Sequence, residues 1–412
     1  MSKAGKIALL ILSLVFFLAW AWWFLTDEAL DAETARWLEK DQVPTPSQGL
    51  DYLFLMGLMA PVDEDPIEYA LDLTRQVDPV LDQPVDYLPE LMRDSPCDID
   101  DWDCWAREDS LWVANTLASY EHVLGRWHSL PVHHDFGEEP LSWLFRLALP
   151  ALEALDYFLA LQLVAAKHSG NLDELALQAF DQAARLASAR PNDGNILSLL
   201  FFESIRERSI RQLFLAIRLG AEPPSSELIE QNFAARIVIE DHLSVWARRE
   251  LSGFRDFRAT FQRGLPDFLL ASKNRTLNRA RECLEQAFPL ADESKLLELM
   301  ESESELCGPA WRSWRNWRGD DLIHLFFMAP DSVACRVHGV ARREHLAKAI
   351  LHALIAYESE SQRLTAIGRA NPYHPDAGAF LKGEQVCFDL PAAACGEVCL
   401  PAPWSVNSLA DH

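Results

Sequence analysis

The sequence has few basic side chains and no motif rich in glycine. Its 412 residues carry 37 lysines and arginines against 62 aspartates and glutamates, so the formal net charge is −25 at pH 7. Most of such a surface would repel a phosphate backbone, and we therefore expect no binding to DNA or RNA. The 17 glycines form neither G-x-G-x-x-G nor a phosphate-binding loop, and H-E-x-x-H and G-x-S-x-G are also missing. The sequence therefore predicts no cofactor and does not indicate an enzyme.

Residues 7–25 (IALLILSLVFFLAWAWWFL) form a long uncharged run near the N-terminus. In a helix these 19 residues would rise about 28 Å, close to the ~30 Å hydrocarbon core of a bilayer. Lys3 and Lys6 precede the run, and Asp27 and Glu28 follow it. Because basic residues stay on the cytoplasmic side, we expect an inner-membrane anchor over residues 1–26, with the N-terminus in the cytoplasm and the bulk of the chain in the periplasm.

The same segment has a second interpretation as a cleaved signal peptide. Ala19-Trp20-Ala21 loosely fits an A-x-A cleavage site. The hydrophobic run continues through Trp22 and Trp23 after that site, which favours an uncleaved anchor. A buried core helix is not favoured, because the run has no polar face to turn toward water.

The cysteines point to the same compartment. Eight cysteines follow the apolar run: Cys97, Cys104, Cys283, Cys307, Cys335, Cys387, Cys395 and Cys399. Their number is even and their spacing matches no zinc site, so we expect disulfides, an oxidising environment and no metal. Sequence alone allows 105 pairings of eight cysteines. We favour Cys97 with Cys104, which would close a short loop, and Cys283 with Cys307, which would join neighbouring helices.

The chain divides into segments of different composition. Hydrophobic residues make up 49% and charged residues 24%, which indicates a globular protein. Residues 27–109 hold 23 acidic and 5 basic side chains and many prolines, and we expect a neck of short helices there. Residues 110–370 have a helical period and predict a helical domain. Residues 371–412 predict a hairpin and a cysteine-rich tail.

The expected fold is all-α, with the transmembrane helix followed by an irregular antiparallel helical array and a small C-terminal β-hairpin. Asp65 and Pro66 predict a helix start, with the helix running to about residue 76. Further helices are expected over 141–166, 172–190, 196–219, 226–251, 266–288 and 332–358, with Pro150 kinking or splitting the first of these. Residues 379–390 (AFLKGEQVCFDL) predict two strands around a Lys-Gly-Glu turn.

Two groups of histidines are candidate functional sites. His122, His128, His133 and His134 cluster near acidic residues, but a loop position favours ordinary surface histidines over a metal site. His338, His345 and His352 recur every seven residues, which places them along one helix face. They can line a cleft, although a solvated stripe is the more common outcome.

A basic aromatic stripe is the strongest binding feature of the sequence. Trp311, Trp314 and Trp317 recur every three residues in WRSWRNWRG, where Arg315 lies between the last two. Tryptophan and arginine are enriched at the centres of protein interfaces. We therefore expect these four residues to contact a partner. The alternative interpretations are that the stripe rests on the bilayer surface or forms a packed core edge.

The C-terminal region resembles a known group of proteins. Asn371-Pro-Tyr-His-Pro-Asp-Ala-Gly-Ala-Phe380 followed by Gln385-Val-Cys-Phe-Asp389 is similar to the closing motif of uncharacterised, N-terminally membrane-anchored helical proteins of proteobacteria. Asn371 stands where those proteins have an acidic residue. The resemblance implies an anchored helical architecture and transfers no activity or catalytic residue.

Together these patterns predict a membrane-anchored periplasmic binding or scaffold protein of the bacterial envelope. Its expected contacts are the inner membrane, through residues 7–25, and an envelope protein. Two alternatives stay open. One is an envelope hydrolase whose carboxylate pair comes together only in the fold. The other is a periplasmic immunity protein that neutralises a cationic toxin through the acidic neck.

Overall fold

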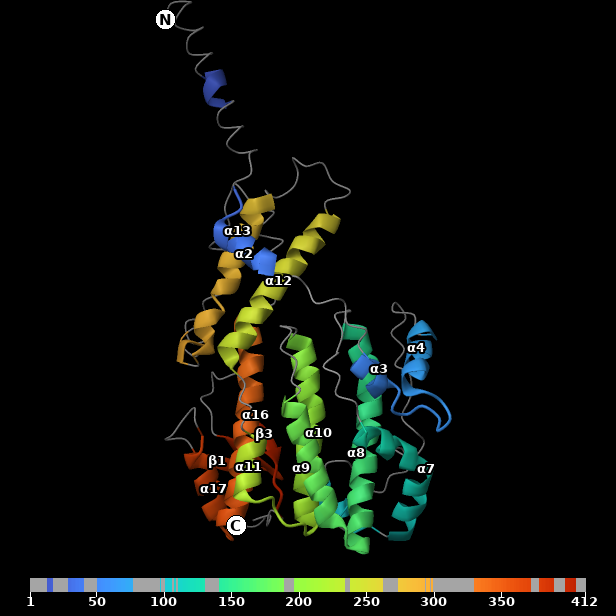
Figure 1. Cartoon of the computed structure of the whole chain (residues 1–412). Helices are drawn as coiled ribbons and strands as arrows, with labels where there is room; N and C mark the ends of the chain where they lie inside the picture. Colours follow the sequence, from blue (N-terminus) through green and yellow to red (C-terminus); the bar gives the residue numbers. More distant parts are fainter. Residues whose placement is uncertain are drawn as a thin grey trace, which may run out of the picture. The chain divides into compact units, whose positions relative to one another are not determined.

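The structure, a computed structural model, is mostly helical with one small sheet (Figure 1). It describes residues 13–17, 29–40, 50–76, 97, 101–105, 107–108, 110–129, 141–188, 196–233, 238–261, 273–292, 294–296, 298, 330–371, 378–388 and 397–404. The helices are α2 (Ala32–Lys40), α3 (Leu50–Met56), α4 (Pro66–Gln76), α6 (Trp102–Trp105), α7 (Ser110–His128), α8 (Leu141–Ser169), α9 (Leu172–Ser188), α10 (Ile196–Leu219), α11 (Ser226–Asn232), α12 (Ile239–Phe261), α13 (Lys273–Glu285), η3 (Phe288–Ala291), α16 (Pro330–Ala356) and α17 (Glu360–Arg369).

The chain forms two compact units, and each is discontinuous in sequence. The first contains residues 1–42 and 238–335, and the second contains residues 43–237 and 336–412. The acidic neck expected over 27–109 contributes its residues up to 42 to the first unit and the remainder to the second.

In the first unit, α13 holds the segment that leads into α2. The Asn278 side chain accepts a hydrogen bond from the backbone of Asp31 at 3.1 Å and donates one to the Ala29 carbonyl at 3.1 Å. Asp31 in turn caps α2, because its Oδ1 accepts from the backbone N–H of Thr34 at 2.7 Å. Arg281 donates from Nε to the Thr34 hydroxyl at 3.0 Å. These bonds join residues almost 250 positions apart in the sequence.

The second unit is built around α7, α8, α9 and α10, which pack as neighbours along the chain. Their apolar faces form one continuous core, whose large buried side chains include Trp105, Trp127, Phe158, Phe202 and Phe214. The stripe of apolar residues at helical spacing drives this packing, because each helix must bury its face against another.

One buried arginine joins several helices of the second unit. Arg206 of α10 is 2% exposed. Its guanidinium pairs with Glu203 at 3.5 Å and with Glu344 of α16. Its Nε donates to the Ala183 carbonyl of α9 at 3.2 Å, and its Cζ lies 5.4 Å from the centre of the Phe233 ring after α11. A single side chain therefore fixes four helices at one point.

A second arginine organises the turn between α3 and α4. Arg126 of α7 donates to the carbonyls of Leu58, Pro61 and Glu64 at 3.2, 2.8 and 2.9 Å. The non-helical connection leaves backbone carbonyls without helical partners, and a guanidinium carries enough donors to bind several of them. The α3–α4 connection is thereby attached to the helical core.

Several helix boundaries match the sequence expectations. Asp65 caps α4, because its Oδ1 accepts from the backbone N–H groups of Ile67 and Glu68 at 2.9 and 3.1 Å. The predicted helix 196–219 is α10 with the same bounds. Pro150 neither ends nor splits α8, which runs unbroken through it.

The single helix expected over 226–251 is wrong. The structure contains α11, which ends at Asn232, and α12, which begins at Ile239. The Phe233 backbone N–H closes α11 by donating to the Ile229 carbonyl. Asparagine favours helix ends over helix interiors, so the boundary has a local signal that the apolar period concealed.

The predicted C-terminal hairpin is present, and it has a third strand. Strand β1 (Ala379–Lys382) pairs antiparallel with β2 (Gln385–Phe388), and β2 pairs antiparallel with β3 (Cys399–Pro401). Gly383 makes the tight turn possible with φ of +61°. A disulfide joins Cys387 to Cys399 across the second pair, and β3 is three residues long, too short for a period-2 pattern to reveal.

Among the described residues, no helix is long and apolar enough to cross a membrane. Of the predicted anchor over 7–25, the structure describes residues 13–17, which are helical.

The Arg206 contacts predict a large effect of a single substitution. Arg206→Met would leave Glu203 and Glu344 with less compensated buried charge, and we expect a loss of roughly 3–5 kcal/mol in unfolding free energy. Arg343→Ala is the matched control, since Arg343 pairs with Glu207 at 3.3 Å but its side chain is 50% exposed. It should cost less than about 1 kcal/mol. Denaturant titration followed by circular dichroism measures both, and equal effects would contradict the prediction.

Candidate functional site

A pocket opens between the C-terminal half of α16 and α17 in the second unit. It has a volume of about 420 Å³, within the range of roughly 300–1,000 Å³ typical of small-molecule sites. Its floor consists of small side chains, which are Ala349, Ala353, Ala356, Ala366 and Ala370. Because alanine extends only one carbon from the backbone, facing alanines leave space between two helices that larger side chains would fill.

The rim of this pocket is polar. His345, Lys348 and His352 line it from α16, and Tyr357 lines it from the turn that follows. The three α16 residues are spaced by three and four positions, which places them on one face of the helix. Ser359 then caps α17, since its hydroxyl accepts from the Gln362 backbone N–H at 3.4 Å. This local cap fixes where α17 begins beside the pocket.

A carboxylate from a third helix sits on the rim. Glu230 of α11 accepts from Lys348 Nζ at 2.7 Å through Oε2, and its Oε1 lies 3.0 Å from His352 Nε2. The hydrogen bond from Lys348 and the neighbouring His352 lower the pKa of Glu230. The Glu230 side chain is nevertheless 60% exposed. Lys348 and His352 therefore contact one carboxylate oxygen each, at a position that is accessible to solvent.

A second, smaller pocket lies between α8 and α10. It holds about 40 Å³ and is lined by Asp156, Arg208, Arg211 and Gln212, among others. Arg208 Nε lies 3.1 Å from Asp156 Oδ2. Burial raises the pKa of Asp156 to about 6, although the two arginines oppose this shift. Gln212 is 4% exposed, and its amide has no hydrogen-bond partner among the described residues.

The residues predicted to bind a partner lie outside the described residues. These are Trp311, Trp314, Trp317 and Arg315, all of which fall between residues 299 and 329. The contact role of this stripe stays a prediction.

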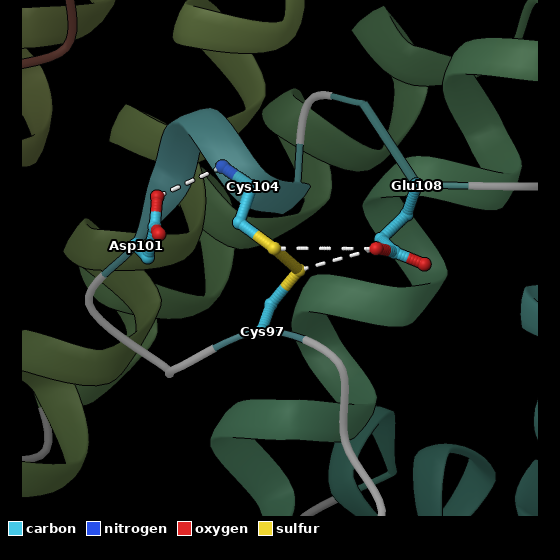
Figure 2. Close-up of a disulfide and its surroundings, with 4 residues drawn as sticks. All are labelled: Cys97, Asp101, Cys104 and Glu108. Atoms are coloured by element: carbon cyan, nitrogen blue, oxygen red, sulfur yellow. Dashed lines mark hydrogen bonds between the residues drawn. A yellow bond between two sulfur atoms is a disulfide. The ribbon is translucent and has the colours of Figure 1, made fainter.

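The structure joins Cys97 to Cys104, the pair favoured from the sequence (Figure 2). Asp101 fixes the loop between them, because its Oδ1 accepts from the Cys104 backbone N–H at 2.8 Å (Figure 2). Cys283 is also disulfide-bonded, and Cys307, its favoured partner, lies outside the described residues.

One group of potential metal ligands exists among the described residues. Cys97, Cys104 and Glu108 place their ligand atoms within 4.8 Å of one another. Glu108 Oε1 lies 3.4 Å from Cys97 Sγ (Figure 2). The disulfide removes both thiolates, however, and the thiolate is the form of cysteine that ligates a metal. The oxidised pair is therefore a structural crosslink in this state.

The two histidine groups have different surroundings. His338 is 1% exposed, whereas His345 and His352 line the α16–α17 pocket. In the other group, His128 Nε2 lies 3.2 Å from Gln162 Oε1, and burial lowers the pKa of His128. His133 and His134 lie outside the described residues. The seven-residue spacing of His345 and His352 therefore indicated part of the pocket lining. Nothing in the sequence around Glu230 indicated that this residue lies beside the pocket.

The raised pKa of Asp156 predicts a pH-dependent stability. Because the folded carboxyl titrates at about pH 6 rather than near 3.8, the folded state binds more protons than the unfolded state between these values. Its contribution to stability is therefore largest below about pH 4 and is lost as the pH rises through about 6. Asp156→Asn should remove this component from unfolding midpoints measured at pH 4.5 and 7, whatever its effect on the absolute midpoint.

The exposed Asp181 offers the control for this measurement. Asp181→Asn should keep the pH dependence of the native chain. An Asp156→Asn protein whose midpoints change with pH as the native protein's do would contradict the assignment.

Comparison of the chain with models of protein families, with curated proteins and with solved structures finds no match to any of them. The resemblance of residues 371–389 to anchored proteobacterial proteins therefore stays a prediction. Residue roles in this chain rest on its own geometry, and the α16–α17 pocket with its charged rim is the larger of the two pockets described above.

Proposed function

We propose that the chain is a membrane-anchored periplasmic binding or scaffold protein of the bacterial envelope. The observation that carries this proposal is the state of the cysteines. All six cysteines that the structure describes are disulfide-bonded, including the local pairs Cys97–Cys104 and Cys387–Cys399. Structural disulfides form and persist in oxidising compartments and are rare in the cytosol.

The described part of the apolar run supports an anchor. Residues 13–17 are helical, and Leu14, Val15 and Phe16 expose 53, 59 and 74% of their surface. Exposing consecutive large apolar side chains to water is unfavourable by roughly 1.5–3 kcal/mol for each side chain that could be buried. A bilayer would bury them, and the flanking charges predict the orientation.

A binding role fits the described sites better than hydrolysis does. Asp156 has the raised pKa expected of a general acid. The volume of its pocket is only about 40 Å³, however, and the Asp156 carboxylate already forms an ion pair with Arg208. Glycan hydrolysis generally needs two carboxylates beside the substrate, and of the described residues lining this pocket only Asp156 supplies one. The larger α16–α17 pocket instead offers an apolar floor and hydrogen-bond donors.

The compartment and the anchor can be tested together. In bacteria that express the full chain, thiol alkylation without a reductant should label no cysteine, and prior reduction under denaturing conditions should expose all eight. The chain should stay with the membranes through a carbonate wash, and a variant lacking residues 7–25 should not. Labelled thiols in the unreduced protein, or unchanged membrane retention in the variant, would overturn this part of the proposal.

The scaffold role predicts a stoichiometric partner. Affinity purification of the full chain from its native membranes should recover such a protein, and Trp314→Ala should lose it because interface tryptophans often contribute 2 kcal/mol or more, at least about 30-fold in affinity. Leu228→Ala is the control, since Leu228 is an exposed apolar side chain on α11, and it should retain the partner. Recovery of the chain alone, or equal recovery from both variants, would count against the partner surface.

A further inference from the structure

We propose that the α16–α17 pocket binds a small amphipathic organic anion, with its acidic group on Lys348 and His352 and its apolar body on the alanine floor. This goes beyond the function proposed above, because it assigns a ligand class to one site and does not depend on the membrane anchor.

The size and lining of the pocket support a compact organic ligand. At about 420 Å³ it is roughly ten times larger than the α8–α10 pocket. Its alanines and the Tyr357 ring present apolar surface, and burial of a ligand's apolar body there would contribute roughly 25 cal/mol per Å². Mostly apolar pockets with a few placed polar groups are typical of small-molecule sites.

Glu230 indicates which head group the rim accepts. Its carboxylate bridges Lys348 Nζ at 2.7 Å and His352 Nε2 at 3.0 Å. The geometry for binding two carboxylate oxygens is therefore already present. Glu230 comes from α11, a helix of seven residues, and its side chain is 60% exposed. Exposed ion pairs contribute little net free energy, so an incoming anion can replace the Glu230 carboxylate at small cost.

The charge of the chain favours a ligand with one acidic group over a polyanion. At a net charge of −25, the protein repels multiply charged species at long range. A single acidic group gains the local donors of Lys348 and His352, while the apolar body supplies the remaining affinity. The ligand class is therefore a monocarboxylate or monosulfonate that carries an apolar ring or short chain.

The test uses naphthalene-2-sulfonate, a monosulfonate that is small enough for the pocket, and the purified full chain in a mild non-ionic detergent. Isothermal titration calorimetry, corrected with protein-free detergent buffer, should detect one site. The uncharged naphthalene-2-sulfonamide should bind at least about 10-fold more weakly, because it loses charge-assisted hydrogen bonds. Lys348→Ala should weaken sulfonate binding by a similar factor.

Two further variants separate this site from a general loss of structure. Glu230→Gln removes the competing carboxylate and should strengthen binding several-fold, a gain that unfolding cannot produce. Ala356→Leu places a larger side chain at an exposed position of the alanine floor and should weaken binding. Lys382→Ala is the matched control, because Lys382 is an exposed lysine that pairs with Glu397 on the C-terminal sheet, and it should leave the affinity unchanged.

The outcomes that overturn the inference are equally specific. They are no saturable binding to the native chain, equal affinity for the sulfonate and the sulfonamide, native affinity in Lys348→Ala, or no gain in Glu230→Gln. Loss of binding in Lys382→Ala comparable to that in Lys348→Ala would also overturn it, because it would assign the effect to overall charge.

Discussion

The fold of the second unit depends on one buried guanidinium. Arg206 pairs with Glu203 and Glu344, donates to the Ala183 carbonyl and stacks near Phe233. Burying two carboxylates and an arginine is costly unless the charges compensate one another closely. The network is therefore satisfied only when α9, α10, α16 and the end of α11 meet in one arrangement. Apolar packing alone is less selective, because cores tolerate many combinations of similar volume. The positions of α11 and α16 in turn bring Glu230 to Lys348 and His352.

Features set by neighbouring residues could be predicted from the sequence. Asp65 before Pro66 gave the start of α4, and Gly383 between alternating strands gave the hairpin. The apolar period located α10 to the residue. The same period was misleading at the helix end that Asn232 marks. It joined α11 to α12 across residue 233. Pro150 was expected to kink or split its helix, but α8 runs unbroken through it. The cost of a proline in a helix, ~3 kcal/mol, is offset where the following turns bury Leu152, Leu155 and Phe158.

The candidate site was less accessible from the sequence than the fold. Heptad spacing placed His345 and His352 on one face, because that depends only on helix geometry. Glu230 lies more than 100 residues away, and nothing in its local sequence distinguishes it from the other acidic residues. The volume of the pocket also arises from alanines on two helices, and alanine alone is as common on packed faces as on open ones. Asp156 shows the same limit, since its raised pKa comes from burial between α8 and α10.

The division of each unit into two distant segments has a consequence for how the chain acquires its structure. The ribosome delivers residues 43–237 long before residues 336–412, although both belong to the second unit. The ion pair between Arg206 and Glu344 can therefore form only after Glu344 has been synthesised. The hydrogen bonds of Asp31 and Thr34 likewise need Asn278 and Arg281, which are synthesised much later. Contacts that join distant parts of a chain form slowly, and an incompletely synthesised unit exposes apolar surface until its later segment packs against it. Neither unit can complete its native contacts while its later segment is missing, so both units reach their final packing only after most of the chain has left the ribosome.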